Sequence, residues 1–228
     1  MHRSFIPGVL TMFMSFAALG FGSKTAHASE SLPAPKLDIT YADKSKPQTA
    51  VFAGGCFWCT EVVFQQILGI SDITSGYSGG AADTANYERV SEGDTGHAES
   101  IKITYDPSKI TYGQLLMIFF STHNPTTLNR QGNDVGTQYR STIFYANADE
   151  KKVAEAYIQQ LTEAKAFPDP IVTTLEPLKA FYPAEAYHQN YACQNPNNPY
   201  IAHIALPKVE KVRDKFKDLL KTTTQPSR

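Results

Sequence analysis

The cysteine-bearing stretch at residues 50–61 constrains this chain more than any other segment. An apolar run ends at two glycines, which precede Cys56, two aromatic residues and Cys59. Apolar residues at helical spacing follow as far as Gly69, a residue type that commonly ends helices. The pattern predicts a strand, a tight turn and a helix, with Cys56 in the turn or in the first helical turn.

This position has chemical consequences for Cys56. Free backbone N–H groups and the positive end of the helix dipole favour a thiolate there, so we expect a lowered pKa. Phe57 and Trp58 would place an apolar, aromatic pocket beside the sulfur. The alternative is an inert cysteine buried among core aromatic residues.

The size and charge of the chain limit its class. The sequence has 228 residues, 42% of them hydrophobic, and a formal net charge of −1. This suits one medium domain with extensions, which we place at residues 49–217. A charge near zero gives no electrostatic case for nucleic acid or an anionic membrane as the main partner.

The first 28 residues have the pattern of a cleavable signal peptide. A basic start precedes an apolar stretch from 5 to 21, and small residues at Ala26 and Ala28 suit an export peptidase. We therefore expect cleavage after Ala28 and a periplasmic or secreted protein; an uncleaved anchor is the alternative.

Two further segments are expected to lie outside the domain. Residues 29–48 are polar and contain prolines, which predicts a flexible linker or an arm laid over the surface. Residues 218–228 are expected to be a disordered tail.

The order of the expected elements predicts an α+β fold. Strands at 70–76 and 99–105 follow each other without a helix of any length between them, and 86–90 reads as a brief strand or a turn. We expect a two-layer sandwich with a mixed sheet and a ferredoxin-like core topology.

Glu99 is the candidate acid. Residues 99–105 alternate, so that Ile101 and Ile103 share one face with Glu99. A carboxyl group at the edge of a buried face has a raised pKa because burial disfavours its charged form. Glu99 is therefore predicted to be a proton donor at neutral pH.

These and other motifs resemble those of one enzyme family. The ordered motifs are Gly55-Cys56-Phe57-Trp58-Cys59-Thr60-Glu61, Gly76-Tyr77-Ser78-Gly79-Gly80, Tyr87-Glu88-Arg89-Val90, Gly93-Asp94-Thr95-Gly96-His97-Ala98-Glu99, Tyr105-Asp106-Pro107, His123-Asn124-Pro125-Thr126-Thr127, Arg130 to Ser141, and Phe181 to Gln189. Together they resemble the A-type peptide-methionine (S)-S-oxide reductases (MsrA), over residues 49–215.

The resemblance implies a reaction for the cysteine. Cys56 matches the nucleophile, which attacks the sulfoxide sulfur, releases methionine and becomes a sulfenic acid. Glu99 matches the acid that protonates the sulfoxide oxygen. Phe57 and Trp58 match the wall that takes the substrate's S-methyl group.

Three more residues match substrate-binding positions of the family. Tyr87 and Tyr139 match hydroxyl donors to the sulfoxide oxygen, and Asp134 matches a polar position that binds the substrate backbone or orders the site. The alternatives are a core or rim tyrosine at Tyr87 and a simple turn at Asp134.

Two thiols, Cys59 and Cys193, are candidates for resolving the sulfenic acid. Relatives with a cysteine at the position of Cys59 often carry another where this chain has Ile201, whereas here Cys193 lies just upstream. We favour Cys59, which can close a short disulfide with Cys56, and place Cys193 next.

The expected partners follow from the resemblance. Recycling would use thioredoxin or a periplasmic thioredoxin-like reductant, acting on a monomer without cofactor, metal or nucleic acid. A zinc site of His188 with the three cysteines is disfavoured, because a second Cys-x-x-Cys or His pair is missing. The rival functions are a thiol–disulfide oxidoreductase using Cys56 and Cys59, and a non-catalytic secreted domain with a Cys59–Cys193 bridge.

Overall fold

The structure is a computed structural model that describes residue 2 and residues 32–222. The expected signal peptide, apart from His2, and residues 223–228 of the expected tail lie outside the described residues. No helix in the described part combines the length and apolar character needed to cross a membrane.

The domain contains a long sheet, a small hairpin and several helices. The strands are β1 (Gln48–Gly54), β2 (Ile70–Ser78), β3 (Ala98–Tyr105), β4 (Arg130–Gln131), β5 (Asp134–Val135), β6 (Ser141–Tyr145), β7 (Thr174–Pro177) and β8 (Tyr182–Pro183). The α-helices are α1 (Phe57–Phe64), α2 (Tyr87–Ser91), α3 (Tyr112–Thr122), α4 (Ala148–Glu163), α5 (Tyr191–Gln194) and α6 (Leu206–Lys215). Short helical turns are η1 (Ala82–Thr84), η2 (Thr137–Tyr139), η3 (Ala186–His188), η4 (Ile201–Ala205, a π-helix) and η5 (Lys217–Leu219).

The sheet confirms the predicted α+β fold. Its strand order is β7-β6-β1-β3-β2-β8. All neighbours are antiparallel except β6 and β7, which are parallel, so the sheet is mixed. The four central strands are connected as β1-α1-β2-β3-α3-β6, which is the ferredoxin-like arrangement.

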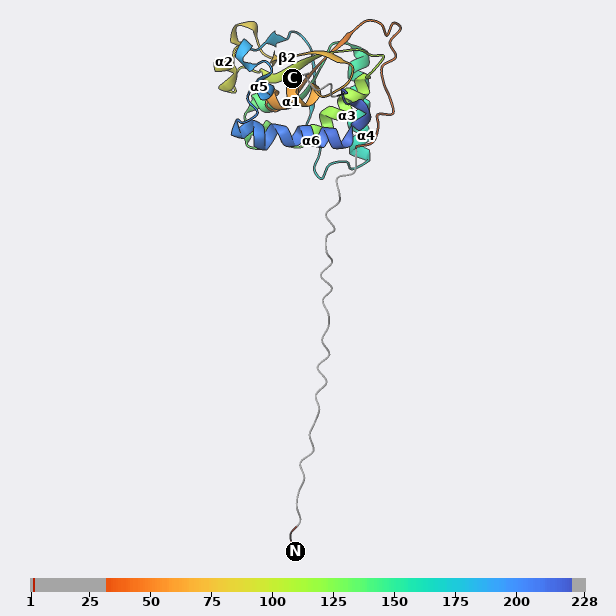
Figure 1. Cartoon of the computed structure of the whole chain (residues 1–228), viewed down its shortest axis with the longest axis vertical. Coiled ribbons are helices and arrows are strands. Elements are labelled where there is room, and N and C mark those ends of the chain that lie inside the picture. The colour runs from red at the N-terminus through yellow and green to blue at the C-terminus, as the bar shows by residue number, and fades with distance from the viewer. Residues whose placement is uncertain (1, 3–31, 223–228) are drawn as a thin grey trace. The chain divides into compact units, whose positions relative to one another are not determined.

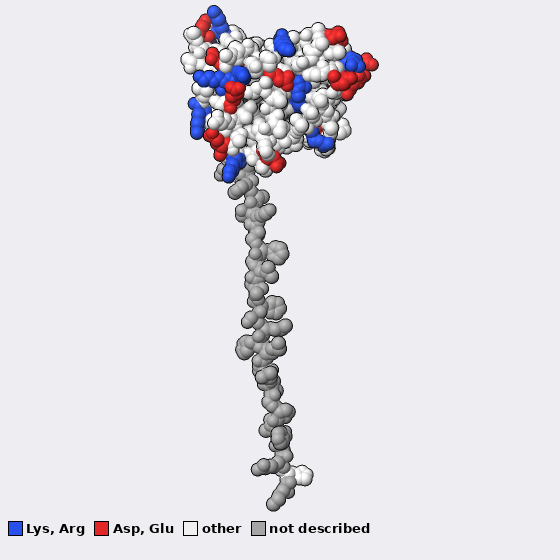
Figure 2. All heavy atoms as spheres, turned by 180° about the vertical axis from the view of Figure 1, so that it is seen from behind, with Lys and Arg blue, Asp and Glu red and all other residues white. Residues whose placement is uncertain are grey.

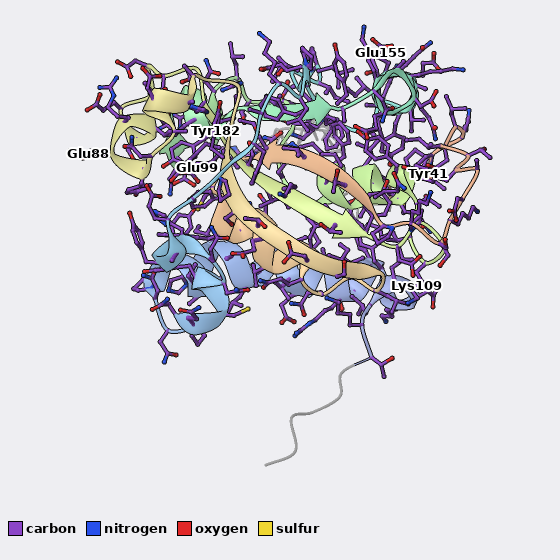
Figure 3. The ribbon with its side chains drawn as sticks, turned by 90° about the horizontal axis from the view of Figure 1, so that it is seen from above. Tyr41, Glu88, Glu99, Lys109, Glu155 and Tyr182 are labelled. Carbon is purple, nitrogen blue, oxygen red and sulfur yellow. The ribbon has the colours of Figure 1, made fainter. Side chains whose placement is uncertain are left out.

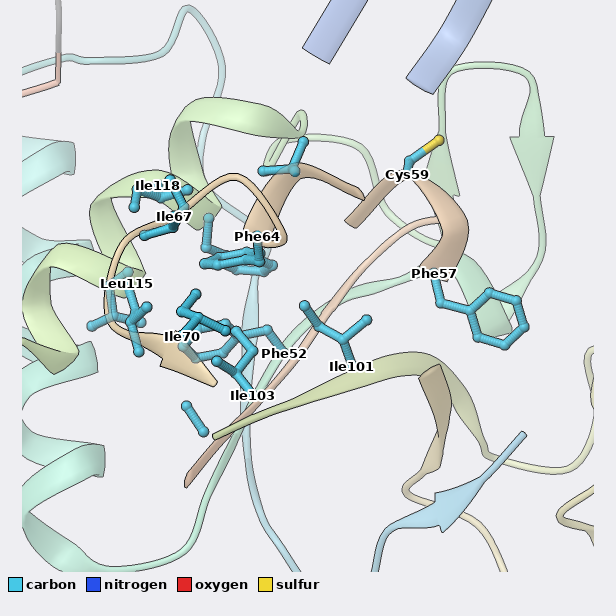
Figure 4. Packing of buried hydrophobic residues seen from close by; sticks show 14 of the residues in the cluster. Phe52, Phe57, Cys59, Phe64, Ile67, Ile70, Ile101, Ile103, Leu115 and Ile118 are labelled. Carbon is cyan, nitrogen blue, oxygen red and sulfur yellow. The ribbon is translucent and has the colours of Figure 1, made fainter. Parts of the chain in front are cut away.

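The helices cover one face of this sheet. α1 and α3 pack on the central strands, α4 packs on β6 and β7, and α6 lies over α1 and α3 (Figure 1). The main core lies between these layers and contains the sheet residues Phe52, Ile101 and Ile103. In Figure 4, the Phe57 ring and the Cys59 sulfur stand at the edge of this core. The first turn of α1 therefore lies at the edge of the core, where a site can form.

The opposite face of the sheet carries a smaller apolar cluster. It consists of Val51, Ala53, Ala98 and Phe144, against which Leu178 and Phe181 pack. Because side chains alternate along a strand, Val51 and Phe52 serve the two different clusters. The central strands are therefore buried on both faces, which gives the site a rigid base.

The segment before β1 is an arm laid over the surface, the second of the two forms expected for residues 29–48. Tyr157 donates a hydrogen bond to the carbonyl of Pro33 (3.0 Å). Asp38 accepts from the backbone N–H of Gly113 (3.0 Å) and from the Thr111 hydroxyl, at the start of α3. The described part of this segment is thus joined to both α3 and α4.

Two expectations are corrected by backbone hydrogen bonds. The tail does not leave the fold at 218, because Leu68 N–H donates to the Leu219 carbonyl and Lys221 N–H to the Gln66 carbonyl. Residues 86–90 form no strand: the Asn86 side chain accepts from Arg89 N–H and begins the helix α2.

The surface charges of the domain are mixed. On the face shown in Figure 2, lysine and arginine lie interspersed with aspartate and glutamate, between wide uncharged areas. A continuous patch of one sign is absent from this face of the described domain. That face therefore offers no strong long-range attraction to a charged partner.

Candidate active site

Cys56 lies between β1 and α1, where the sequence places it. It is the N-cap residue of α1 and follows Gly55, whose φ of +92° is rarely adopted by other residues. A Cβ on Gly55 would lie 2.6 Å from the Gln131 side chain of β4. Glycine therefore allows both the turn and the close approach of the β4–β5 hairpin to the cysteine.

A cavity of about 130 Å³ opens beside this cysteine. Its lining residues are Cys56, Phe57, Trp58, Tyr87, Glu99, Asp134, Tyr139 and Tyr200. Seven of these eight are the predicted nucleophile, acid and substrate-binding residues, brought together from separate loops and elements. Their catalytic and binding roles remain predictions.

Glu99 points into the site from the start of β3. Figure 3 shows it at one end of the sheet, on the side of α2, which carries Glu88. Its side chain is 4% exposed and accepts a hydrogen bond from Phe57 N–H at 3.0 Å. Burial raises its pKa to about 8, more than the hydrogen bond lowers it. The predicted raised pKa is confirmed, and most Glu99 carries a proton at pH 7.

The expected low pKa of Cys56 is wrong for this state of the site. Burial raises the pKa of the Cys56 thiol well above its ordinary value, and its hydrogen bond to Cys59 and the negative charge of Glu99 act in the same direction. Sequence reasoning assumed that the first amide of the helix would face the sulfur. Instead, the Phe57 N–H donates to Glu99.

Cys59 lies behind the cavity and holds the more acidic thiol. It is 1% exposed and is absent from the cavity lining. The hydrogen bond from Cys56 lowers the pKa of Cys59 to about 7, against the effect of burial, and the charge of Lys208 on α6 contributes. The three cysteines of the chain are all free. The reduced pair is therefore ready for proton exchange between its two sulfurs.

Aromatic rings build one wall of the site. Trp58 stacks on Tyr191 of α5, with ring centroids 3.9 Å apart and an interplanar angle of 13°. The buried His188 ring packs on Phe57, Trp58 and Tyr87 at 5.1, 5.6 and 4.5 Å. Packing on several rings limits the motion of the two predicted wall residues.

Tyr87 enters the site from the first turn of α2. Glu185 accepts hydrogen bonds from Tyr87 N–H (2.9 Å) and from the Tyr77 hydroxyl (3.0 Å). Glu185 thus connects α2 to β2 and holds the backbone of Tyr87, from which the side chain extends. Tyr87 is a rim residue and not a core residue, since its side chain is 37% exposed, and it also lines the cavity.

The other polar residues come from the segment between α3 and β6. Asp134 lies in β5 and Tyr139 in η2. Burial raises the pKa of Tyr139, so its hydroxyl keeps the proton that it would donate to an oxygen. Asp134 does more than make a turn, because its Oδ2 accepts a 2.5 Å hydrogen bond from the Tyr200 hydroxyl.

Tyr200 is the lining residue that sequence reasoning missed. It lies at the N-cap of η4, and its backbone N–H donates to the Asn198 side chain at 2.9 Å. The adjacent residue, Ile201, stands where the family resemblance implies a further cysteine in other members. A cysteine that resolves the sulfenic acid has to approach the nucleophile, so the position of Ile201 is the sequence signal that could have identified Tyr200.

Cys193 is outside the cavity. It is exposed on α5, and its thiol donates to Gln65 Oε1 at 3.1 Å. Gln65 follows Cys59 by six residues, roughly 9 Å along a helix axis. Cys193 would therefore need a movement of α5 to reach Cys56.

The described residues form no metal site. None of their His, Cys, Asp and Glu side chains gather in groups of three or more that could hold an ion. The four residues of the disfavoured zinc alternative accordingly form no such group.

Comparisons with known proteins agree with this geometry. A sequence profile described as "Peptide methionine sulfoxide reductase" matches residues 48–220. The chain is 58% identical to "Peptide methionine sulfoxide reductase MsrA 2" of Mesorhizobium japonicum over 177 residues, covering 76% of this chain and 91% of the relative. It is 50% identical to a protein of the same description from Synechocystis, covering 85% of this chain and 92% of the relative.

Solved structures give the same result. The reduced form of Mxr1 from Saccharomyces cerevisiae is 39% identical, with a TM-score of 0.62 over 70% of this chain and 91% of the other. Methionine sulfoxide reductase A of Corynebacterium diphtheriae is 28% identical, with a TM-score of 0.58 over 73% and 86%. Sequence profile, relatives and fold agree, and the chain belongs to the peptide methionine sulfoxide reductases, as an oxidoreductase of the MsrA type.

Proposed function

We propose that the protein reduces the S epimer of methionine sulfoxide in peptides and proteins, with Cys56 as nucleophile and Glu99 as proton donor. The observation that carries this is the cavity that combines a cysteine, a buried acid and an aromatic wall. A sulfoxide oxygen leaves poorly until it is protonated, and Glu99 keeps its proton at neutral pH.

The first step would use the two cysteines together. Cys59 takes the proton of Cys56, which it already receives in a hydrogen bond, as the Cys56 sulfur attacks. The sulfoxide oxygen takes the Glu99 proton and passes to Cys56 as a sulfenic acid, while methionine leaves. The substrate sulfur is reduced and the Cys56 sulfur oxidised by the same two electrons.

The second step would resolve the sulfenic acid with Cys59. Cys59 is in hydrogen-bonding contact with Cys56, whereas Cys193 contacts Gln65 outside the cavity. The disulfide would then be reduced by thioredoxin or a thioredoxin-like protein, as the family resemblance implies.

The thiol–disulfide oxidoreductase alternative is less well supported. Such an enzyme would need only the Cys56 and Cys59 pair. It would have no use for a buried, protonated carboxyl beside Cys56, yet Glu99 lines the same cavity and its pKa is raised to about 8. A proton donor beside the cysteine favours a sulfoxide on methionine as the substrate.

Export remains part of the proposal because of the sequence of residues 1–28. When the full chain is expressed in a bacterium with a periplasm, we expect mature protein beginning at Ser29 in the periplasmic fraction. Full-length protein in the cytoplasm would contradict export, and full-length protein in the membrane fraction would indicate an uncleaved anchor.

The activity is tested with both sulfoxide epimers of a methionine peptide and dithiothreitol as reductant. We expect loss of the S epimer only, and no loss with Cys56→Ser. Consumption of neither epimer by the wild-type protein would refute the proposed function.

A further inference from the structure

A short chain of hydrogen bonds joins Cys59 to Asp134. The Cys59 thiol lies 3.7 Å from the Tyr200 hydroxyl, which lies 2.5 Å from Asp134 Oδ2. Sulfur hydrogen bonds are longer than those of oxygen, and the second contact has the length of a strong bond to a charged group. The three side chains come from α1, the N-cap of η4 and β5, so the fold brings them together from separate elements.

The direction of proton donation in this chain depends on whether Cys59 carries its proton. A tyrosine hydroxyl has one proton, and Tyr200 donates it to Asp134. When Cys59 is a thiol, as it is after it has taken the Cys56 proton, Tyr200 can only accept from it, so the thiol donates to the phenol and the phenol to the carboxylate. Both donors point toward Asp134, which is the arrangement of a proton relay.

The resolving step has a proton that needs such a path. After methionine has left, Cys59 holds the proton taken from Cys56 and has to lose it to attack as a thiolate. We propose that Asp134, acting through Tyr200, is the general base that removes the Cys59 proton when Cys59 closes the disulfide with Cys56. This inference depends on the proposed function, whose second step it deepens.

Bonds, electrons and protons all balance in this resolving step. The Cys59–Cys56 S–S bond forms as the S–O bond of the sulfenic acid breaks, which oxidises the Cys59 sulfur and reduces the Cys56 sulfur. The leaving hydroxide takes a proton from Glu99, protonated again from solvent, and departs as water. The Cys59 proton passes to the Tyr200 oxygen while Tyr200 gives its own proton to Asp134.

The groups around Cys59 favour this assignment. The groups that act on Cys59 are Cys56 at the same helix end, Lys208 on α6, Tyr200 at the N-cap of η4 and Asp134 in β5. The positive charge of Lys208 stabilises the thiolate, but a charged lysine cannot accept a proton. Among these groups, only the Asp134 carboxylate both accepts a proton and is connected to Cys59 by hydrogen bonds.

Tyr200 is suited to transfer a proton and not to remain as a charged phenolate. Burial and the neighbouring cysteines raise its pKa far above the ordinary value of a phenol. It therefore takes and gives a proton in one event and returns to the neutral form. Glu99 acts separately, because its carboxyl is held by the Phe57 amide.

The relay is tested by timing the two steps separately with Tyr200→Phe, which keeps the ring and removes the hydroxyl. Reduced enzyme is mixed with one equivalent of the S-sulfoxide peptide without reductant and quenched at intervals. Methionine peptide is measured by chromatography, and the disulfide by mass spectrometry of the alkylated protein. The matched control is Tyr191→Phe, whose hydroxyl contacts Asn198 while its ring stacks on Trp58.

We expect Tyr200→Phe to slow disulfide formation on the order of 10²-fold, a typical loss for a general base. Because Tyr200 also lines the cavity beside Cys56, methionine release is expected to slow as well, but much less than disulfide formation, so the ratio of the second rate to the first should fall. Raising the pH should restore the second step because solvent then ionises Cys59. Asp134→Asn should slow the second step more than the first, with the Tyr200 ring intact. Tyr191→Phe should leave the ratio of the two rates unchanged.

Three results would overturn the relay: equal slowing of both steps, an unchanged second step, or a disulfide between Cys56 and Cys193. A wild-type protein that releases no methionine would instead refute the proposed function, together with the relay that depends on it.

Discussion

The raised pKa of Glu99 leads to a quantitative prediction for Glu99→Gln. With a pKa of about 8, about nine-tenths of Glu99 is protonated at pH 7, whereas a carboxyl with the ordinary pKa of 4.5 would be about 0.3% protonated. Burial therefore increases the acid form roughly 300-fold. Glutamine can still accept the hydrogen bond from Phe57 N–H but has no proton to transfer, so we expect a loss of about 10²–10⁴-fold in methionine release at pH 7.

The pH dependence separates proton donation from a structural role. The acid form of Glu99 falls about tenfold between pH 7 and pH 9, so the wild-type-to-variant ratio of single-turnover rates should fall by the same factor. The control is Glu150→Gln, which replaces another buried carboxyl with a raised pKa, at the start of α4. A ratio that stays constant from pH 6 to pH 10, or a variant as fast as wild type, would refute the role of Glu99.

Three further predictions concern stability and the third cysteine. Gly55→Ala should cost about 1–3 kcal/mol of unfolding free energy in urea titrations, because the φ of Gly55 is +92° and the new Cβ would meet Gln131. The control is Gly132→Ala, which should cost less because Gly132 has a φ of +61° and open space around the new Cβ. Equal losses in the two variants would rule out crowding at Gly55. Asp38→Ala should cost about 1 kcal/mol in the same measurement, since the start of α3 loses an acceptor, and an unchanged midpoint would show that the arm adds nothing. Cys193→Ser should still form the Cys56–Cys59 disulfide after one turnover, as shown by peptide mapping, and a stable sulfenic acid would show that Cys193 resolves it.

The sequence was sufficient for the parts of the site that depend on local pattern. Strand alternation assigned Glu99 to the face of Ile101 and Ile103, and all three side chains are buried. Glycines before Cys56 predicted the turn that the backbone makes. In these cases the residue pattern itself determines which way a side chain points.

The features of the site that the sequence did not predict depend on contacts between segments far apart in the chain. Burial raises the pKa of Cys56, and the neighbouring Phe57 amide, which could have lowered it, donates instead to Glu99, 42 residues along the chain. Tyr200 reaches Asp134 across 66 residues. The same reason applies to residues 29–48, because composition alone does not show that Asp38 would bond to the start of α3.

The central claim is that Cys56 carries the oxygen taken from the substrate. It is tested most directly in a variant with Cys59→Ser and Cys193→Ser, given one equivalent of the S-sulfoxide peptide and then a sulfenic-acid trap such as dimedone. The account predicts one adduct per methionine released, located by peptide mapping on Cys56. Methionine release without a Cys56 adduct, or an oxidised enzyme without methionine release, would contradict it.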